Sequence, residues 1–191
     1  YGHAHIDTNG NWIYNLYNHS DKVQRLAQGQ TDSETITVQA ADGTKHDIVM
    51  TITGSNDLPT VAEKTNLGQT VSTHSVTEDA NHSASGQLIL NDIDGDTLSV
   101  SVDHAHQAQF GTVQYDQHLG VWFYSVDNTN AHVNALNDGD SLNDTFALLV
   151  DDGHGGKVSQ TITLTINGHT DPTPYVAPTI SVTVDTSHGQ H

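Results

Sequence analysis

The sequence has no cysteine, few cations and no long apolar run, and each absence excludes a class of protein. Without cysteine the chain forms no disulfide, no thiolate zinc site and no thiol nucleophile, while the compartment stays open. Lys and Arg number 5 against 23 Asp and Glu, a formal net charge of −18, so the chain repels phosphate backbones and anionic lipid surfaces. No segment approaches the ~20 apolar residues of a membrane span. We therefore expect neither nucleic-acid binding nor membrane insertion.

Catalytic motifs are also missing. The sequence has no phosphate-cradling glycine loop and no nucleophile elbow, and its Ser, His and Asp residues form no distinctive arrangement. Only 34% of the residues are hydrophobic, which favours a thin core such as that of a two-layer sandwich. The sequence predicts a protein that is not an enzyme.

Two stretches of the chain, residues 7–43 and 116–153, are versions of each other. Trp12 aligns with Trp122, Tyr14 with Tyr124, Leu26 with Leu136, Gly29 with Gly139, and Asp42–Gly43 with Asp152–Gly153. An internal period of this length is typical of repeat arrays. The predicted organisation is the C-terminal half of a repeat in residues 1–57, a complete repeat in 58–172, and a linker with the first strand of a further module in 173–191.

The hydrophobic pattern is that of strands. Ile162, Leu164 and Ile166 alternate with Thr and Asn, and similar alternation recurs throughout the chain. The predicted strands of the complete copy lie near 71–77, 86–90, 97–103, 110–115, 121–126, 144–150 and 157–167, with a further edge strand near 60–65. Short helical turns are expected only around 20–26 and 130–136. Seven short strands separated by Gly, Asn and Asp turns predict an all-β fold, an antiparallel β-sandwich arranged in tandem repeats.

All four prolines fall at the expected junctions. They are Pro59 after the first copy and Pro172, Pro174 and Pro178 after the second. Proline lacks the amide that a central strand needs, so this placement supports the boundaries. After Pro178, residues 179–185 alternate again, as the first strand of a further module would.

The acidic residues gather in a few loops. The candidate ligands are Asn56, Asp57 and Asp171 before the junction prolines, Glu78 and Asp79 after a strand, Asp92, Asp94 and Asp96 between strands, and Asp151 and Asp152 before Gly153. Carboxylates at i, i+2 and i+4 in a glycine-containing loop can turn onto one hard cation, and calcium takes 6–8 oxygen ligands. The alternative is a set of solvated turns, because Asp, Asn and Gly are also the usual turn residues. Chain topology predicts two groups, with residues 56–57, 92–96 and 151–152 at one pole and residues 78–79 and 171 at the other.

Several of these motifs together resemble the VCBS repeats. The resemblance rests on Gly120, Trp122, Tyr124, Asn128, Leu136 and Gly139, with TED at 77–79, DIDGDTL at 92–98 and the N-D-x-P junction at 56–59, and it covers nearly all of 1–172. VCBS repeats belong with the bacterial cadherin-like modules of very large RTX-type adhesins. The resemblance implies a cadherin-like or immunoglobulin-like sandwich, type I secretion to the bacterial cell surface, attachment and biofilm formation, and Ca²⁺ between neighbouring repeats of one chain. The second junction has Thr170 where the first has Asn56, and no GGxGxD run is present.

Other functions stay open at this stage. The leading hypothesis is a calcium-binding extender or adhesion module whose partners are neighbouring repeats and a cell-surface glycan or protein. The alternatives are a module that grips a glycan or peptide directly, and an accessory domain of a secreted polysaccharide-degrading enzyme. Trp12 and Trp122 are expected in the core but are also candidate sugar platforms. The pairs His3/His5 and His104/His106 are half-sites for zinc or nickel if they are not simply exposed strand residues.

Overall fold

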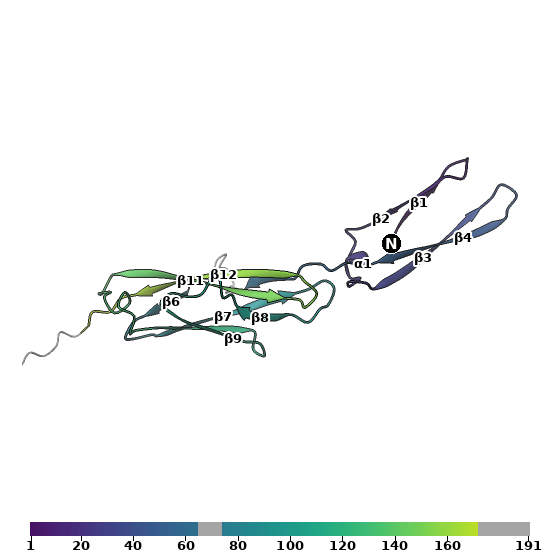
Figure 1. Cartoon of the computed structure of the whole chain (residues 1–191). Helices are drawn as coiled ribbons and strands as arrows, with labels where there is room; N and C mark the ends of the chain where they lie inside the picture. The colour runs from purple at the N-terminus through teal and green to yellow at the C-terminus, as the bar shows by residue number, and fades with distance from the viewer. Residues whose placement is uncertain (65–73, 172–191) are drawn as a thin grey trace, which may run out of the picture.

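The computed structural model describes residues 1–64 and 74–171 and divides into two parts that lie end to end (Figure 1). The first part is a pair of β-hairpins, which we call the N-terminal hairpin pair (residues 1–53). The second is a β-sandwich (residues 60–167). The predicted strand at 179–185, the three later prolines and the beginning of the predicted strand 71–77 lie outside the described residues.

The N-terminal hairpin pair contains two separate two-stranded sheets. β1 (Gly2–Ile6) pairs with β2 (Trp12–Leu16), and β3 (Thr31–Gln39) pairs with β4 (Lys45–Thr53), both antiparallel. The short helix α1 (Asp21–Gln24) connects the hairpins and buries Val23. Each hairpin therefore keeps strand edges that no described strand covers.

The β-sandwich consists of two four-stranded sheets. Its strands are β5 (Thr60–Glu63), β6 (His74–Thr77), β7 (Ser83–Asn91), β8 (Ser99–Val102), β9 (Gly111–Asp116), β10 (Val121–Val126), β11 (Ser141–Asp151) and β12 (Lys157–Asn167). One sheet has the order β5-β7-β10-β9 and the other β6-β12-β11-β8. All eight strands fall where alternation predicted them.

One strand pair departs from the expected antiparallel pattern. β6 pairs in parallel with β12, from His74 opposite Leu164 to Thr77 opposite Asn167, whereas the other pairs of the sandwich are antiparallel. β6 is thus an edge strand of this sheet. It lies beside the last residues of β12, where the chain leaves the sandwich. The helical turn expected near 20–26 is α1, but residues 130–136 form turns without a helix.

Trp122 lies at the centre of the core, between the sheets. It is 0% exposed and meets Phe146 of the opposite sheet edge-on, with ring centroids 5.5 Å apart. Its indole nitrogen donates to Glu63 Oε1 at 3.0 Å. The expectation that Trp122 is a core residue is confirmed, whereas its counterpart Trp12 is 46% exposed.

Candidate metal centres at the two poles

Three aspartates converge in the loop between β7 and β8. Carboxylate oxygens of Asp92, Asp94 and Asp96 all lie within 4.8 Å of one another, the one group of three potential ligands found among residues 1–64 and 74–171. The loop curls because the amides of Asp94 and Asp96 point at Asp92 Oδ1, at 2.9 and 3.5 Å, and because Gly95 adopts a positive φ of 79°. The i, i+2, i+4 spacing thus brings the carboxylates together as predicted.

The linker from the N-terminal hairpin pair joins this loop. The Asp57 amide donates to Asp94 Oδ2 at 2.8 Å, and Asn56 Nδ2 donates to Asp152 Oδ2 at 2.8 Å. We call the end of the sandwich formed by residues 56–57, 92–96 and 151–156 the near pole. The predicted meeting of these three segments is confirmed.

The turn between β11 and β12 holds its acids in different ways. Asp152 is 2% exposed and accepts the amides of His154 and Gly156 at 2.7 and 2.9 Å. Gly156 is required here because a Cβ would lie 2.0 Å from Asp152 Oδ2. Asp151 instead pairs with Lys157 at 2.7 Å, which holds the pKa of the Asp151 carboxyl below its ordinary value. Asp152 therefore faces the near pole, and Asp151 is already neutralised by a cation of the protein.

Several buried oxygens of the near pole have no hydrogen-bond partner. They are Asn56 Oδ1, Asp92 Oδ2, Asp94 Oδ1 and Asp96 Oδ2, although His154 Nδ1 lies 3.0 Å from the last. Burial raises the pKa of Asp94, and the neighbouring Asp57, Asp92 and Asp96 charges raise it further. An uncompensated cluster of buried acceptors is unfavourable. The donor set, oxygen atoms alone, fits a hard cation such as Ca²⁺.

The opposite end, the far pole, gathers Glu78, Asp79 and Asp171. Glu78 is 2% exposed and accepts a hydrogen bond from the His169 amide at 3.1 Å. The backbone of Asp79 is left-handed, with a φ of 55°, and its carboxylate accepts a hydrogen bond from the Asn128 side chain at 3.0 Å. A hydrogen bond with Asp79 raises the pKa of Asp171. Two neighbouring carboxyl groups of like charge indicate that negative charge is concentrated at this end. The predicted far group is thus also brought together.

Sequence reasoning missed other groups at the poles. His154 reaches Asp96 at the near pole, and Asn128 Oδ1 is a further buried oxygen without a partner at the far pole. His169 lies 3.3 Å from Asp138, whose pKa is lowered chiefly by the Thr170 amide. Asn128 belongs to the repeated pattern, so its recurrence at Asn18 was an available signal. His154 had no such signal.

Comparison with known proteins decides the family. The model of the bacterial cadherin-like domain matches residues 56–168, more than half of the chain. This chain belongs to the bacterial cadherin-like domain family. The match spans the β-sandwich, the near pole and, at the far pole, Glu78 and Asp79, and it confirms the cadherin-like β-sandwich fold. No curated protein matches the chain.

Comparison with solved structures also finds similarity to cadherins. The chain is similar to the protocadherin GammaB4 extracellular domain (13% identity, TM-score 0.47, 85% of this chain and 24% of that one) and to protocadherin Gamma B2 extracellular cadherin domains 3-6 (11%, 0.49, 86% and 36%). It is also similar to a nucleoside hydrolase-related hypothetical protein from Saccharophagus degradans (17%, 0.33, 60% and 26%). This cadherin-like chain thus spans roughly a quarter to a third of the length of these structures.

The other candidate sites receive less support in the cadherin-like chain. His106 is exposed and pairs with Asp103 at 2.8 Å, and no group of three ligands in the described parts of the chain includes a histidine.

Among the same residues, no helix has the length and apolarity needed to cross a membrane.

Proposed function

We propose that this cadherin-like chain is a non-catalytic, calcium-binding extender and adhesion module. In this proposal it is a VCBS-type part of a large secreted bacterial surface protein that works in attachment and biofilm formation. Family membership supports the coarser statement, an extracellular adhesion-type module. The observation that carries the calcium assignment is the set of buried, unpartnered oxygens at the near pole, contributed by a linker and by a separate loop.

A cation at the near pole would act mechanically. Asn56, Asp57, Asp92, Asp94, Asp96 and Asp152 would supply its ligands. When bound, Ca²⁺ would neutralise these carboxylates and tie the linker at 56–57 to the loop at 92–96. A linker bound to a rigid sandwich loses the freedom to swing, so successive units of the chain keep a fixed direction. The partners are then neighbouring repeats of the same chain and a cell-surface glycan or protein. A stiff array would reach this glycan or protein at a distance from the cell.

The test is a thermal melt of the chain with millimolar calcium, with a chelator, and with magnesium at matched ionic strength. Extracellular calcium modules bind with Kd of roughly 10⁻⁴–10⁻³ M. Calcium at ten times Kd that binds only the folded state adds about 1.4 kcal/mol, which raises the Tm of a domain of this size by about 5 °C. Magnesium should produce much less, because it prefers a smaller, octahedral and partly hydrated site.

Matched variants locate the effect. Asp92→Asn with Asp152→Asn should remove the calcium-selective shift while keeping the side-chain volumes. Asp103→Asn removes one negative charge at the other end of β8, where Asp103 is held by His106, and should leave the shift intact. If no calcium-selective shift occurs, or if all three substitutions leave it unchanged, the metal assignment is wrong and the loops are solvated turns.

A further inference from the structure

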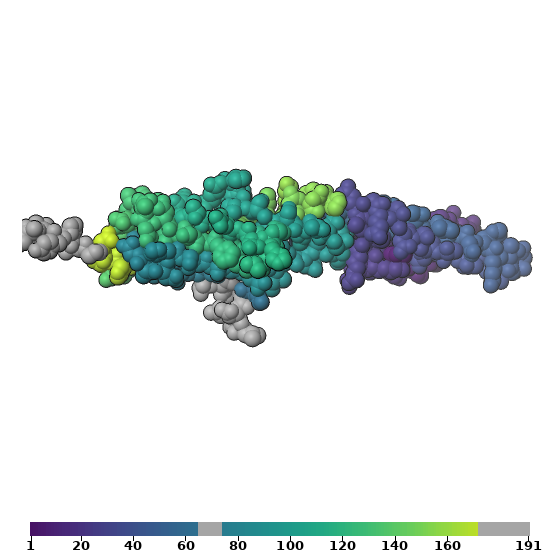
Figure 2. Space-filling view, turned by 90° about the horizontal axis from the view of Figure 1, so that it is seen from below, coloured from purple at the N-terminus to yellow at the C-terminus, as the bar shows by residue number. Residues whose placement is uncertain are grey.

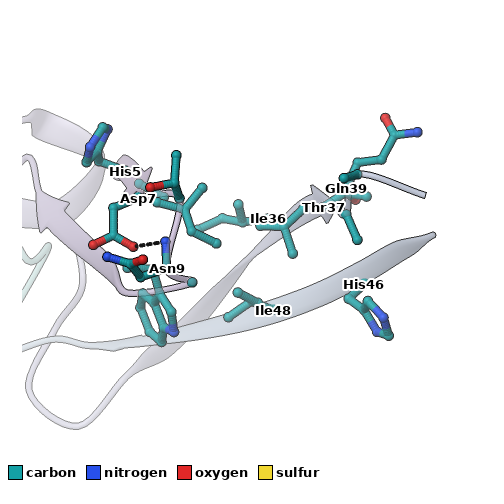
Figure 3. A pocket seen from close by; sticks show the side chains of 16 residues that line it. His5, Asp7, Asn9, Ile36, Thr37, Gln39, His46 and Ile48 are labelled. Atoms are coloured by element: carbon teal, nitrogen blue, oxygen red, sulfur yellow. Dashed lines mark hydrogen bonds between the residues drawn. The ribbon is translucent and has the colours of Figure 1, made fainter. Parts of the chain in front are cut away.

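The N-terminal hairpin pair exposes an apolar groove between its two hairpins. The groove has a volume of about 880 Å³ and is lined by Trp12, Ile36, Val38 and Ile48 among others. Figure 3 shows Ile36 and Ile48 on the β3–β4 hairpin and Asp7 and Asn9 at the tip of the β1–β2 hairpin around this space. Figure 2 shows the hairpin pair extending from one end of the sandwich, so the sandwich does not enclose it. An open groove lined by apolar side chains is a candidate contact surface for a further segment.

The first hairpin reproduces the β9–β10 hairpin of the sandwich in detail. Tyr14 donates to Glu34 at 2.6 Å as Tyr124 donates to Asp144 at 2.8 Å. A Cβ on Gly2 would lie 2.4 Å from the Tyr14 ring, the same distance that separates a Cβ on Gly111 from the Tyr124 ring. Tyr1 thus corresponds to Phe110: their carbonyls accept the amides of Tyr17 and Asp127 at 2.9 and 2.8 Å.

The second hairpin reproduces β11–β12. Ile36 faces Ile48 across β3–β4, and Phe146 faces Ile162 across β11–β12. In both copies the glycine that follows the last strand packs on the preceding turn, Gly54 on Leu26 and Gly168 on Leu136. The equivalence therefore extends through the whole N-terminal hairpin pair.

In the sandwich, four further strands cover the surface that corresponds to the groove. β7 pairs with β10, β8 with β11, and β6 with β12, while β5 extends the sheet beside β7. Around Trp122, Glu63 of β5 accepts from the indole nitrogen, His74 of β6 meets the ring at 4.6 Å, and Gly86 of β7 leaves room for it. The counterparts of the covered residues in the hairpin pair are Trp12, Ile36 and Ile48.

We propose that the groove of the N-terminal hairpin pair is a strand-accepting site for a segment like residues 58–109, joined to Tyr1 in the same polypeptide. The occupant supplies four strands, with alternating apolar residues facing the groove and a carboxylate opposite Trp12. It pairs with the free edges of β2, β3 and β4, as β7, β8 and β6 pair with β10, β11 and β12. Connection at Tyr1 follows from its correspondence with Phe110, because residues 103–109 lead from β8 into that position. A single strand would pair with only one of the three edges. A second copy of the hairpin pair would leave the edge of β4 without a partner, the edge that corresponds to the parallel pairing of β6 with β12.

The experiment compares the 191-residue chain with the same chain carrying an added copy of residues 58–109 before Tyr1. This added copy contains neither Trp nor Tyr, and Trp122 is fully buried, so Trp12 is the reporter of fluorescence quenching by acrylamide. We expect the added copy to reduce the quenching constant at least threefold. It should also raise the hydrogen-exchange protection of amides in β2, β3 and β4 at least tenfold.

Neighbouring substitutions confined to the added copy provide the control. Leu88 is buried in the sandwich and Ile89, beside it on β7, is 55% exposed. Leu88→Asp in the added copy should abolish the protection of Trp12, and Ile89→Asp should preserve it. Unchanged quenching in the fused chain, or equal effects of the two substitutions, would overturn the proposal. Concentration-dependent protection of Trp12 in the unfused chain would also overturn it, because the groove would then accept a second copy.

Discussion

At the scale of single residues, the carboxylates with buried oxygen atoms fall into two groups. Asp144 is 1% exposed and accepts four hydrogen bonds, from the amides of Gln109, Phe110 and Thr145 and the Tyr124 hydroxyl. Such a carboxylate is satisfied and stabilises the core. Asp92 and Asp94 each keep a buried oxygen without a partner. The second group is the one to which the proposed calcium site would bring a ligand.

The two tryptophans should differ in their contribution to stability. Trp122→Ala removes a fully buried side chain and leaves a cavity, at a cost of ~3–5 kcal/mol in the free energy of unfolding. Trp12→Ala, the aligned substitution at a half-exposed site, should cost under ~1 kcal/mol. Urea denaturation followed by circular dichroism measures both. A change below ~1 kcal/mol for Trp122→Ala would return this residue to the candidate sugar platforms.

Asp94 should give the near pole a specific pH dependence when calcium is absent. Its pKa is raised in the folded state, so between the ordinary value of 3.8 and the raised value the folded chain holds more protons than the unfolded one. Stability from this group therefore falls as pH rises through that window, and the ionised carboxylate is unfavourable at neutral pH.

The corresponding variant is Asp94→Asn. With chelator at pH 7 it should melt roughly 2–5 °C above the unsubstituted chain, and the two should converge as pH falls below about 4. In millimolar calcium at pH 7 the order should reverse. Equal melting temperatures in chelator at both pH values would show that Asp94 carries no charge penalty.

At the scale of elements, alternation was enough to find the strands but not every pairing. Polar residues at every second position predicted β12 over 157–167 with its observed bounds, Lys157–Asn167. The parallel pairing of β6 with β12 escaped prediction because it joins residues 90 positions apart, and the local pattern of a strand is the same for either direction. Chain topology predicted the two poles, since it fixes which loops lie at the same end. The partners His154 and Asp138 come from side-chain geometry that spacing does not encode.

The two equivalent hairpins test whether packing or local sequence stabilises the strands. β3–β4 and β11–β12 share pairing and alternation, but among the described strands only β11–β12 is bordered by further strands, β6 and β8. Hydrogen exchange of the 191-residue chain should show amides of β11–β12 protected at least tenfold more than those of β3–β4. Equal protection would mean that the N-terminal hairpin pair forms a complete core, contrary to the boundaries predicted at residues 57–58.

At the scale of the whole molecule, the charge distribution matters as much as the fold. A formal charge of −18 on an elongated chain produces repulsion along its length. Part of this repulsion is diffuse, and part is concentrated at the near and far poles. The two parts differ in their response to salt. Salt screens the diffuse repulsion beyond the Debye length, but it screens the charge on buried oxygens much less.

Monovalent salt and calcium should therefore stabilise the chain separately. In chelator, raising NaCl from 0.01 M to 0.15 M shortens the Debye length from about 30 Å to about 8 Å and should raise the Tm by several degrees. Calcium added at constant ionic strength should raise the Tm further, because it would bind the buried oxygens of Asp92 and Asp94. Sodium at that concentration should bind these oxygens poorly. Asp92→Asn with Asp152→Asn should remove the calcium increment and keep the salt increment. If sodium at matched ionic strength reproduces the whole effect of calcium, the acidic loops act only through diffuse charge, and the near pole is not a cation site.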